Sequence, residues 1–401
     1  MKKVIALLIA ACLVLGLCAC GTASSGQSNP EPAPAEAVKP AEPAPAAEQE
    51  PAPKTDPVKI GVIFYSKDDA LGRLVYSYLN YAASVIDGLE VQWAIGSFSA
   101  EAQLQDAENL ISAGVQGIMA LTLDDVAMTQ IAKTCNDNGV YFQVMFRKPA
   151  SEDTAKLLET FPYYVGYAIE DTVATSTETI NILANDGIKN IAVGGNTHSA
   201  TSLLRMEGMN IGLERYGVNK VAEFDIGTDV TGIQSDLQNI LDTYSDVEAV
   251  WSMSGSSGIA DIIVNTLRAH KEATGKTIGL MTFDTFDGMA GAFDEGLLYG
   301  AVSGQAPLCL AAFSALYNAI DGTPLSSEKV EILFPFLIIA STEDLNFMEQ
   351  YYNNDEIQLY DEETIKESLY RYNPSVKLDD LQAFWSSFSM DWIRQEMATR
   401  G

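Results

Sequence analysis

Residues 277–305, TIGLMTFDTFDGMAGAFDEGLLYGAVSGQ, contain two apolar runs that each end on a polar side chain. The first run, 278–283, is predicted to be a strand that ends on Asp284. The second, 297–302, is predicted to be a strand that leads to Gln305. Open α/β sheets bind ligands outside the carboxyl ends of their strands, so the stretch predicts a small-molecule cleft. The alternative is that Asp284 caps a helix and Gln305 lies in a loop.

The rest of the chain continues this alternation of apolar strands and helices. Strands are predicted over 59–65, 89–95, 117–121, 140–146, 163–165, 188–194, 221–225 and 249–253, and helices over 71–87, 100–113, 124–138, 172–185, 202–216, 233–244 and 258–273. Two successive series of similar size are typical of an α/β protein with two doubly wound parallel-sheet lobes.

The predicted strands are not followed by the motifs of nucleotide-binding or hydrolytic enzymes. The sequence has no GxGxxG after a strand, no P-loop, no GxSxG and no HExxH. It has only two histidines, His198 and His270, and no Cys/His cluster suited to zinc. We therefore expect no catalytic residues, no cofactor and no metal site.

The first residues predict export and lipidation. Two lysines and a short apolar run form a secretory signal over residues 1–19, too short for a membrane span. The run closes on Leu17-Cys18-Ala19-Cys20, which resembles a lipobox. This implies a lipid-anchored Cys20 on the outer face of the membrane. The alternative is an ordinary cleaved signal with incidental cysteines.

Residues 20–57 are predicted to be a tether between the anchor and the folded part. The segment holds nine of the chain's 15 prolines, together with Ala and Glu, and almost no large apolar residue. Such a composition cannot bury enough apolar surface to fold, and proline keeps the chain extended at about 3.1 Å per residue. We expect the folded part to work outside the membrane.

Charge and cysteine content limit the partners and the chemistry. The formal net charge is −30 at pH 7, which argues against nucleic acid and anionic membrane surfaces as partners. Only Cys135 and Cys309 follow the tether, each in an apolar helical context, so buried free thiols are expected.

The first apolar run ends on Phe283-Asp284, and the second leads to Gln305-Ala306-Pro307. These two segments resemble the type I periplasmic binding proteins, the ribose- and galactose-binding family related to LacI-type regulators. Supporting segments follow in the family's order: Tyr164-Val165-Gly166, Arg205-x-x-Gly208, and the apolar run 247–251 before a Ser/Gly-rich loop. The resemblance covers roughly residues 59–336.

The resemblance implies two lobes joined by a three-segment hinge, with crossings near 163–167, 303–306 and 334–337. The N-lobe would comprise 58–165 plus 306–335, and the C-lobe 166–305. Residues 341–401 exceed the usual family length. They are predicted to be a helical extension, with helices over 361–372 and 378–396, anchored on a lobe by Trp385 and Trp392.

The resemblance also implies the ligand-binding residues. Arg205, Asp284 and Gln305 match family positions, and Ser254 replaces an amide-bearing residue of ribose-type binders. Where those binders carry Asp-Arg, this chain carries Arg147-Lys148. The loop in which sugar binders supply aromatic rings here offers Asp68, Asp69 and Arg73.

The three arginines near one predicted cleft suggest a sugar-like ligand that carries an acid group, because guanidinium groups pair well with carboxylates and phosphates. The alternative is that Arg205 pairs with Asp284 in the cleft, while Arg147 and Arg73 are solvated or bridge the lobes.

Two functions fit these features, and a third does not. The resemblance favours a monomeric, lipid-anchored substrate-binding protein that closes on a sugar-like ligand and delivers it to an ABC permease. A sensor that presents a bound sugar or signal molecule to a membrane receptor would share the same fold and cleft. A glycan-cleaving enzyme would need two carboxylates on opposite sides of a bond, and the adjacent Asp68 and Asp69 do not provide that arrangement.

Overall fold

The computed structural model describes residues 57–196, 200–227 and 230–400. The described residues belong to one compact unit. The predicted signal peptide, the tether before residue 57 and Cys20 lie outside the described residues. No helix in the described part of the chain is long and apolar enough to cross a membrane.

The first lobe is built on a six-stranded, all-parallel sheet in the order β11-β5-β4-β3-β1-β2. The strands are β1 (Val58–Phe64), β2 (Leu89–Ile95), β3 (Gly117–Ala120), β4 (Tyr141–Met145), β5 (Tyr164–Glu170) and β11 (Val330–Phe334). The helices are α1 (Ala70–Val85), α2 (Ala100–Ser112), α3 (Asp125–Asn138), α4 (Glu152–Glu159) and α10 (Leu308–Ile320). Helices α1 and α10 pack together, as do α2 and α3.

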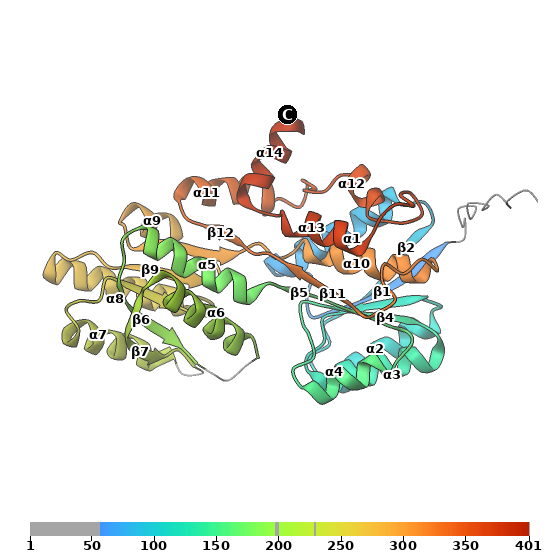
Figure 1. Ribbon diagram of the computed structural model, residues 1–401, viewed down its shortest axis with the longest axis horizontal. Coiled ribbons are helices and arrows are strands. Elements are labelled where there is room, and N and C mark those ends of the chain that lie inside the picture. The colour runs from blue at the N-terminus through green and yellow to red at the C-terminus, as the bar shows by residue number, and fades with distance from the viewer. Residues whose placement is uncertain (1–56, 197–199, 228–229, 401) are drawn as a thin grey trace, which may run out of the picture. The chain divides into compact units, whose positions relative to one another are not determined.

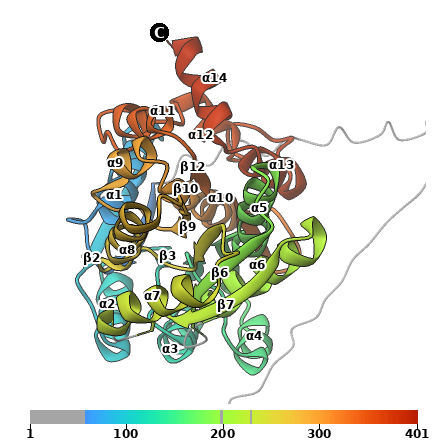
Figure 2. The same ribbon diagram turned by 90° about the vertical axis from the view of Figure 1, so that its left-hand side faces the viewer.

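The second lobe repeats this plan with the order β12-β10-β9-β8-β6-β7, in which only the edge strand β12 is antiparallel. The strands are β6 (Asn190–Gly195), β7 (Asn219–Asp225), β8 (Ala249–Ser252), β9 (Gly279–Phe283), β10 (Leu298–Ser303) and β12 (Leu337–Ile339). The helices are α5 (Thr172–Asn185), α6 (Ala200–Tyr216), α7 (Ile233–Thr243), α8 (Ile259–Thr274) and α9 (Met289–Asp294), with a short 3₁₀ turn, η1 (Val230–Gly232), before α7. Figure 2 shows α5 and α6 on one side of this sheet and α7 and α8 on the other. The predicted fold of two doubly wound parallel-sheet lobes is confirmed.

The sequence places the helix starts at the carboxyl edges of the strands. Asp69 begins α1 by accepting a hydrogen bond from the Gly72 amide at 2.7 Å, and Asp124 and Asp171 cap α3 and α5 in the same way. These caps turn the chain directly after β1, β3 and β5, which leaves the loops between strand and helix at one edge of the sheet.

The chain passes between the two sheets at three places. β5 remains in the first sheet up to Glu170, so the first crossing lies after this residue rather than near Val165. The second lies between β10 and α10, and the third between β11 and β12. The expected boundary was too early because the sequence-based strand stopped at Val165, whereas pairing with β11 extends β5 to Glu170.

The C-terminal extension contains short helices: α11 (Thr342–Phe347), a π-helix (Met348–Tyr352), α12 (Glu362–Glu367), α13 (Leu378–Ser386) and α14 (Met390–Arg400). The predicted helix 378–396 is interrupted because Phe388 turns into the core and Ser389 caps α14 through the Trp392 amide. The predicted helix 361–372 is likewise shorter, ending at Glu367. Figure 1 shows α11 beside α9, and α12 and α13 beside the first lobe.

Aromatic side chains attach this extension to the first lobe. Trp385 is 1% exposed, and its ring lies 6.3 Å from that of Phe334 in β11 and 5.2 Å from that of Tyr360. Trp392 stacks on Tyr360 with ring centroids 4.9 Å apart. The extension therefore shares the hydrophobic core of the first lobe.

Replacing Trp385 with alanine should lower the free energy of unfolding by about 3–5 kcal/mol, because it opens a cavity between β11 and the extension. Chemical denaturation followed by circular dichroism measures this. Phe98→Ala is the control: Phe98 is 71% exposed, so a change within about 0.5 kcal/mol is expected. A loss for Trp385→Ala as small as that of the control would contradict a shared core.

Candidate functional site

Three of the predicted ligand residues meet at the carboxyl edge of the second sheet. Ser254 follows β8, Asp284 follows β9, and Arg205 lies in α6. The Ser254 hydroxyl donates to the Asp284 carboxylate at 2.9 Å. Arg205 contacts the residue before each of them: its Nη1 donates to the Met253 carbonyl at 2.6 Å, and its guanidinium lies over the Phe283 ring, 4.1 Å from the centroid. We call these three residues the C-lobe cluster.

The Arg205 guanidinium is enclosed but incompletely hydrogen-bonded. Burial lowers its pKa, while the nearby carboxylates of Asp284 and Glu170 act to raise it. Its Nε is buried and has no hydrogen-bond partner among the described residues. A buried donor without a partner costs free energy, so a ligand oxygen at this position would be favoured.

Backbone strain occurs after a strand of each sheet: at Phe146 after β4 of the first sheet and at Asp284 after β9 of the second. Among the described residues, positive φ angles occur outside glycine at Phe146 (60°), Ser257 (56°) and Asp284 (68°). Asp284 belongs to the C-lobe cluster, and Phe146 directly precedes Arg147. Residues held in such conformations concentrate at ligand-binding sites, where the surrounding structure stabilises them.

Glu170 is a candidate that the sequence analysis missed. It ends β5 at the first crossing and keeps only part of its surface exposed. Burial raises its pKa to about 7, while Arg205 and Arg147 act to lower it. Glu170 thus interacts electrostatically with one arginine from each lobe. The sequence signal that could have identified Glu170 is a carboxylate at the end of a strand. It was overlooked because the predicted strand stopped at Val165.

The first-lobe candidates take different positions. Asp69 caps α1 and hydrogen-bonds Tyr65; burial first, and this bond second, raise the pKa of the Tyr65 hydroxyl. Asp68 is exposed, and its amide donates to the Ser66 hydroxyl at 3.0 Å. Arg147 is exposed after β4, near Glu170. Arg73 pairs with Asp355 of the C-terminal extension at 3.2 Å, so it does not join the others.

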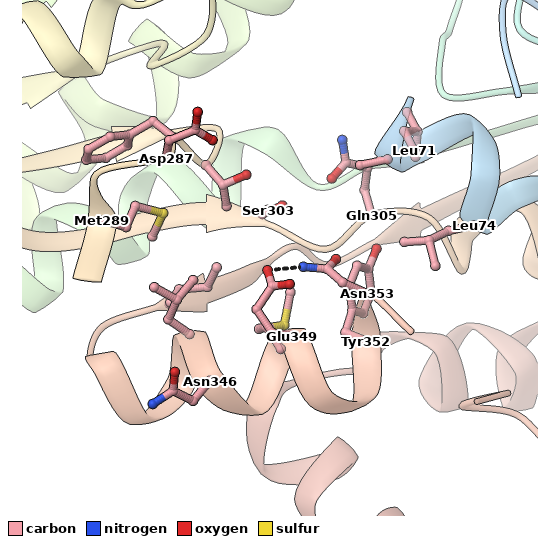
Figure 3. A pocket seen from close by; sticks show the side chains of 16 residues that line it. Leu71, Leu74, Asp287, Met289, Ser303, Gln305, Asn346, Glu349, Tyr352 and Asn353 are labelled. Atoms are coloured by element: carbon pink, nitrogen blue, oxygen red, sulfur yellow. Dashed lines mark hydrogen bonds between the residues drawn. The ribbon is translucent and has the colours of Figure 1, made fainter. Parts of the chain in front are cut away.

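Gln305 lies at the second crossing and lines a separate cavity of about 470 Å³. The cavity is bounded by α1, by residues around α9, by the crossing and by the C-terminal extension (Figure 3). Its lining includes Leu71, Leu74, Phe286, Asp287, Glu349 and Tyr352. The C-lobe cluster does not line it, so Gln305 borders a different space from Arg205 and Asp284.

The described residues contain no group of three or more His, Cys, Asp or Glu that could hold a metal ion. Cys135 and Cys309 are free and buried.

Residues 60–324 match the model of the periplasmic binding protein domain. The chain belongs to this family. The type I fold inferred from the sequence is thereby confirmed, and so is the expectation of a protein that binds solutes and catalyses no reaction. A periplasmic binding domain works outside the cytoplasm.

Solved structures support the same fold at low identity. A Bacillus halodurans C-125 ABC transporter solute-binding protein with bound myo-inositol is 18% identical, with a TM-score of 0.54 over 74% of this chain and 99% of that chain. The fructose-binding periplasmic domain of a hybrid two-component system is 16% identical, with a TM-score of 0.53 over 73% and 94%. The arabinose-transporter binding protein of Shewanella sp. ANA-3, bound to L-arabinofuranose, is 15% identical, with a TM-score of 0.56 over 73% and 95%. No curated protein sequence matches this chain.

Glu170→Gln should change how the stability of this periplasmic binding protein depends on pH. The pKa of the Glu170 carboxyl group is about 7 in the folded state, against an ordinary value of 4.5. Between pH 4.5 and pH 7 the folded state therefore keeps a proton that the unfolded state releases. Glu170 therefore reduces the free energy of unfolding as pH rises through this window. The variant should gain stability relative to the parent at pH 8 and lose that advantage at pH 4.5. Thermal melts at both pH values measure the difference, and an equal difference at the two would contradict the assignment.

Proposed function

We propose that this protein captures a sugar or sugar-like small polar ligand between its two lobes and delivers it to an ABC permease. The observation that carries the proposal is the C-lobe cluster: a buried guanidinium with an unpartnered Nε beside a serine–aspartate pair, at the carboxyl edge of a parallel sheet. Such a site offers donors and acceptors to neighbouring hydroxyl groups, and the Phe283 ring fixes the guanidinium.

The solved relatives agree with a hydroxyl-rich ligand. One holds myo-inositol and another L-arabinofuranose, both small polyhydroxylated molecules. Ligands of this size are held in sites that are mostly pre-formed between domains, and closure of the lobes completes their burial.

The charge balance favours a neutral ligand over the acidic one suggested by three arginines. Arg73 is paired with Asp355, and Arg205 lies near Asp284 and Glu170. Arg147 is exposed, and Glu170 is close enough to interact with it. An acid-bearing ligand would have to pair with Arg147.

Anchoring at Cys20 completes the proposal. A basic start, a short apolar run and the lipobox-like Leu17–Cys20 sequence support a lipoprotein, and the proline-rich tether would let the binding unit reach a permease in the same membrane.

A second candidate is a sensor that presents its bound ligand to a membrane receptor as a monomer. The observation in its favour is the similarity to the fructose-binding domain of a two-component system, which has the same fold. Co-purification with a permease would favour import, and co-purification with a receptor kinase would favour sensing.

A thermal-shift screen of residues 53–401 against neutral sugars, polyols, sugar acids and nucleosides tests ligand binding. A ligand at 100 times its Kd stabilises by about 2.7 kcal/mol, a shift of several degrees. We expect Arg205→Ala to abolish the shift, because it removes the guanidinium from the C-lobe cluster. Arg73→Ala, which loses an exposed ion pair outside the cluster, should retain it. The proposed site is wrong if both variants keep the shift.

Arg147→Ala decides whether the ligand carries a negative charge. If the ligand is neutral, we expect it to bind the parent and the variant alike, with a change in Kd of less than about threefold. The reason is that the substitution then removes no strong charge-assisted hydrogen bond to the ligand. Calorimetric titration measures this. If only sugar acids bind, and Arg147→Ala weakens them about tenfold or more, the ligand is acidic.

A further inference from the structure

The C-terminal extension is attached to the first lobe along much of its length. Arg371 and Asp321 form a buried ion pair at 2.6 Å, and the Asn318 side chain accepts from the Tyr370 amide at 2.7 Å. Nearer the start of the extension, the Ser77 hydroxyl of α1 donates to the Asp355 carbonyl at 3.0 Å. These contacts, together with the ring contacts of Trp385 with Phe334 and Tyr360, fix the extension on α1, α10 and β11.

The same extension also reaches the second lobe. It begins directly after β12, which pairs with β10, and α11 packs against α9. The Thr342 hydroxyl donates to Asp294 at the end of α9, at 3.3 Å. Arg394 of α14 binds Asp344 of α11 and lies over the Phe347 ring. The part of the extension on the second lobe is therefore tied to the part on the first.

Between these attachments the extension contacts the hinge itself. The Tyr352 hydroxyl accepts a hydrogen bond from the Ala306 amide at 2.9 Å, and the contact is buried. Ala306 is the neighbour of Gln305 at the second crossing. Tyr352 ends the π-helix, an uncommon element that is frequent at functional positions.

The cavity beside this contact gives the lobes room to move. Its walls come from both lobes and from the extension, and they include Leu71 of α1 and Asp287 before α9 (Figure 3). Rotation about the crossings changes the separation of α1 and α9, so it must also change this cavity. The extension forms one wall of this cavity through Asn346, Glu349 and Tyr352.

We propose that residues 341–400 form a brace that restrains the angle between the two lobes, with Tyr352 as the positioning residue that holds the Gln305–Ala306 crossing. The brace lies beyond the residues that match the family model, 60–324. Its consequence for ligand capture rests on the proposed function, whereas the restraint itself requires no ligand. Through its bond to Ala306, Tyr352 also holds Gln305 at the wall of the cavity.

Interlobe distances measured without ligand test the brace. Lys133→Cys in α3 and Gln234→Cys in α7 place spin labels on exposed positions of the two lobes, while Cys135 and Cys309 are buried and stay unlabelled. In residues 53–401, which form one compact unit, pulsed electron paramagnetic resonance then gives the distance distribution. We expect Tyr352→Phe to broaden the distribution and shift its mean, because it removes the bond to Ala306.

Two matched controls separate the brace from a general loss of stability. Tyr317→Phe removes another buried tyrosine hydroxyl, which has no hydrogen-bond partner among the described residues. Arg268→Ala is the control for a second test variant, Arg394→Ala. Arg394→Ala releases α11 from α14 and should broaden the distribution like Tyr352→Phe, whereas Arg268→Ala breaks an ion pair confined to the second lobe. The distribution should stay narrow in Tyr317→Phe and Arg268→Ala.

An unchanged distribution in folded Tyr352→Phe, or equal broadening in all four variants, would overturn the brace. If Tyr352→Phe does not fold, the comparison of Arg394→Ala with Arg268→Ala replaces it. Equal distance distributions in these two variants would then overturn the brace. Because no ligand enters the experiment, its outcome is independent of the thermal-shift screen that tests the proposed function.

Discussion

The candidate site depends on holding the Arg205 guanidinium largely away from water. Taking a charge out of water is costly unless it is paired and hydrogen-bonded. Here the Met253 carbonyl, the Phe283 ring and the carboxylates of Asp284 and Glu170 share that role. These partners come from α6, the loop after β8, the end of β9 and the end of β5. The ends of separate elements thus meet at one charge, whose Nε has no hydrogen-bond partner among the described residues.

The second constraint is mechanical. Two lobes joined only by short crossings can rotate with little resistance, since few residues absorb the change in backbone angles. In this chain a further segment contacts both lobes and the crossing beside Gln305. Ligand binding would then have to supply the free energy that moves the brace. A ligand shifts such an equilibrium only by the difference in its affinity for the open and closed forms. Brace and ligand site are therefore expected to act on the same equilibrium.

The sequence was sufficient for the fold and for part of the site. Apolar runs of strand length alternating with helical patterns predict the two parallel sheets, and Arg205, Ser254 and Asp284 were placed at the edge where they are found. Arg73 and Asp355 are 282 positions apart, so no local pattern could reveal that they pair. Glu170 was missed because its strand is completed by β11, far along the chain. The helix break at Phe388 depends on tertiary packing, which overrides local helical preference.

The most direct measurement is a crystal structure of residues 53–401 with the tightest ligand from the screen. We expect density between the lobes, with ligand oxygens within hydrogen-bonding distance of Arg205 Nε and of the Asp284 carboxylate. Density confined to the cavity between Leu71 and Tyr352, or on the outer surface, with no contact to Arg205 or Asp284, would contradict it.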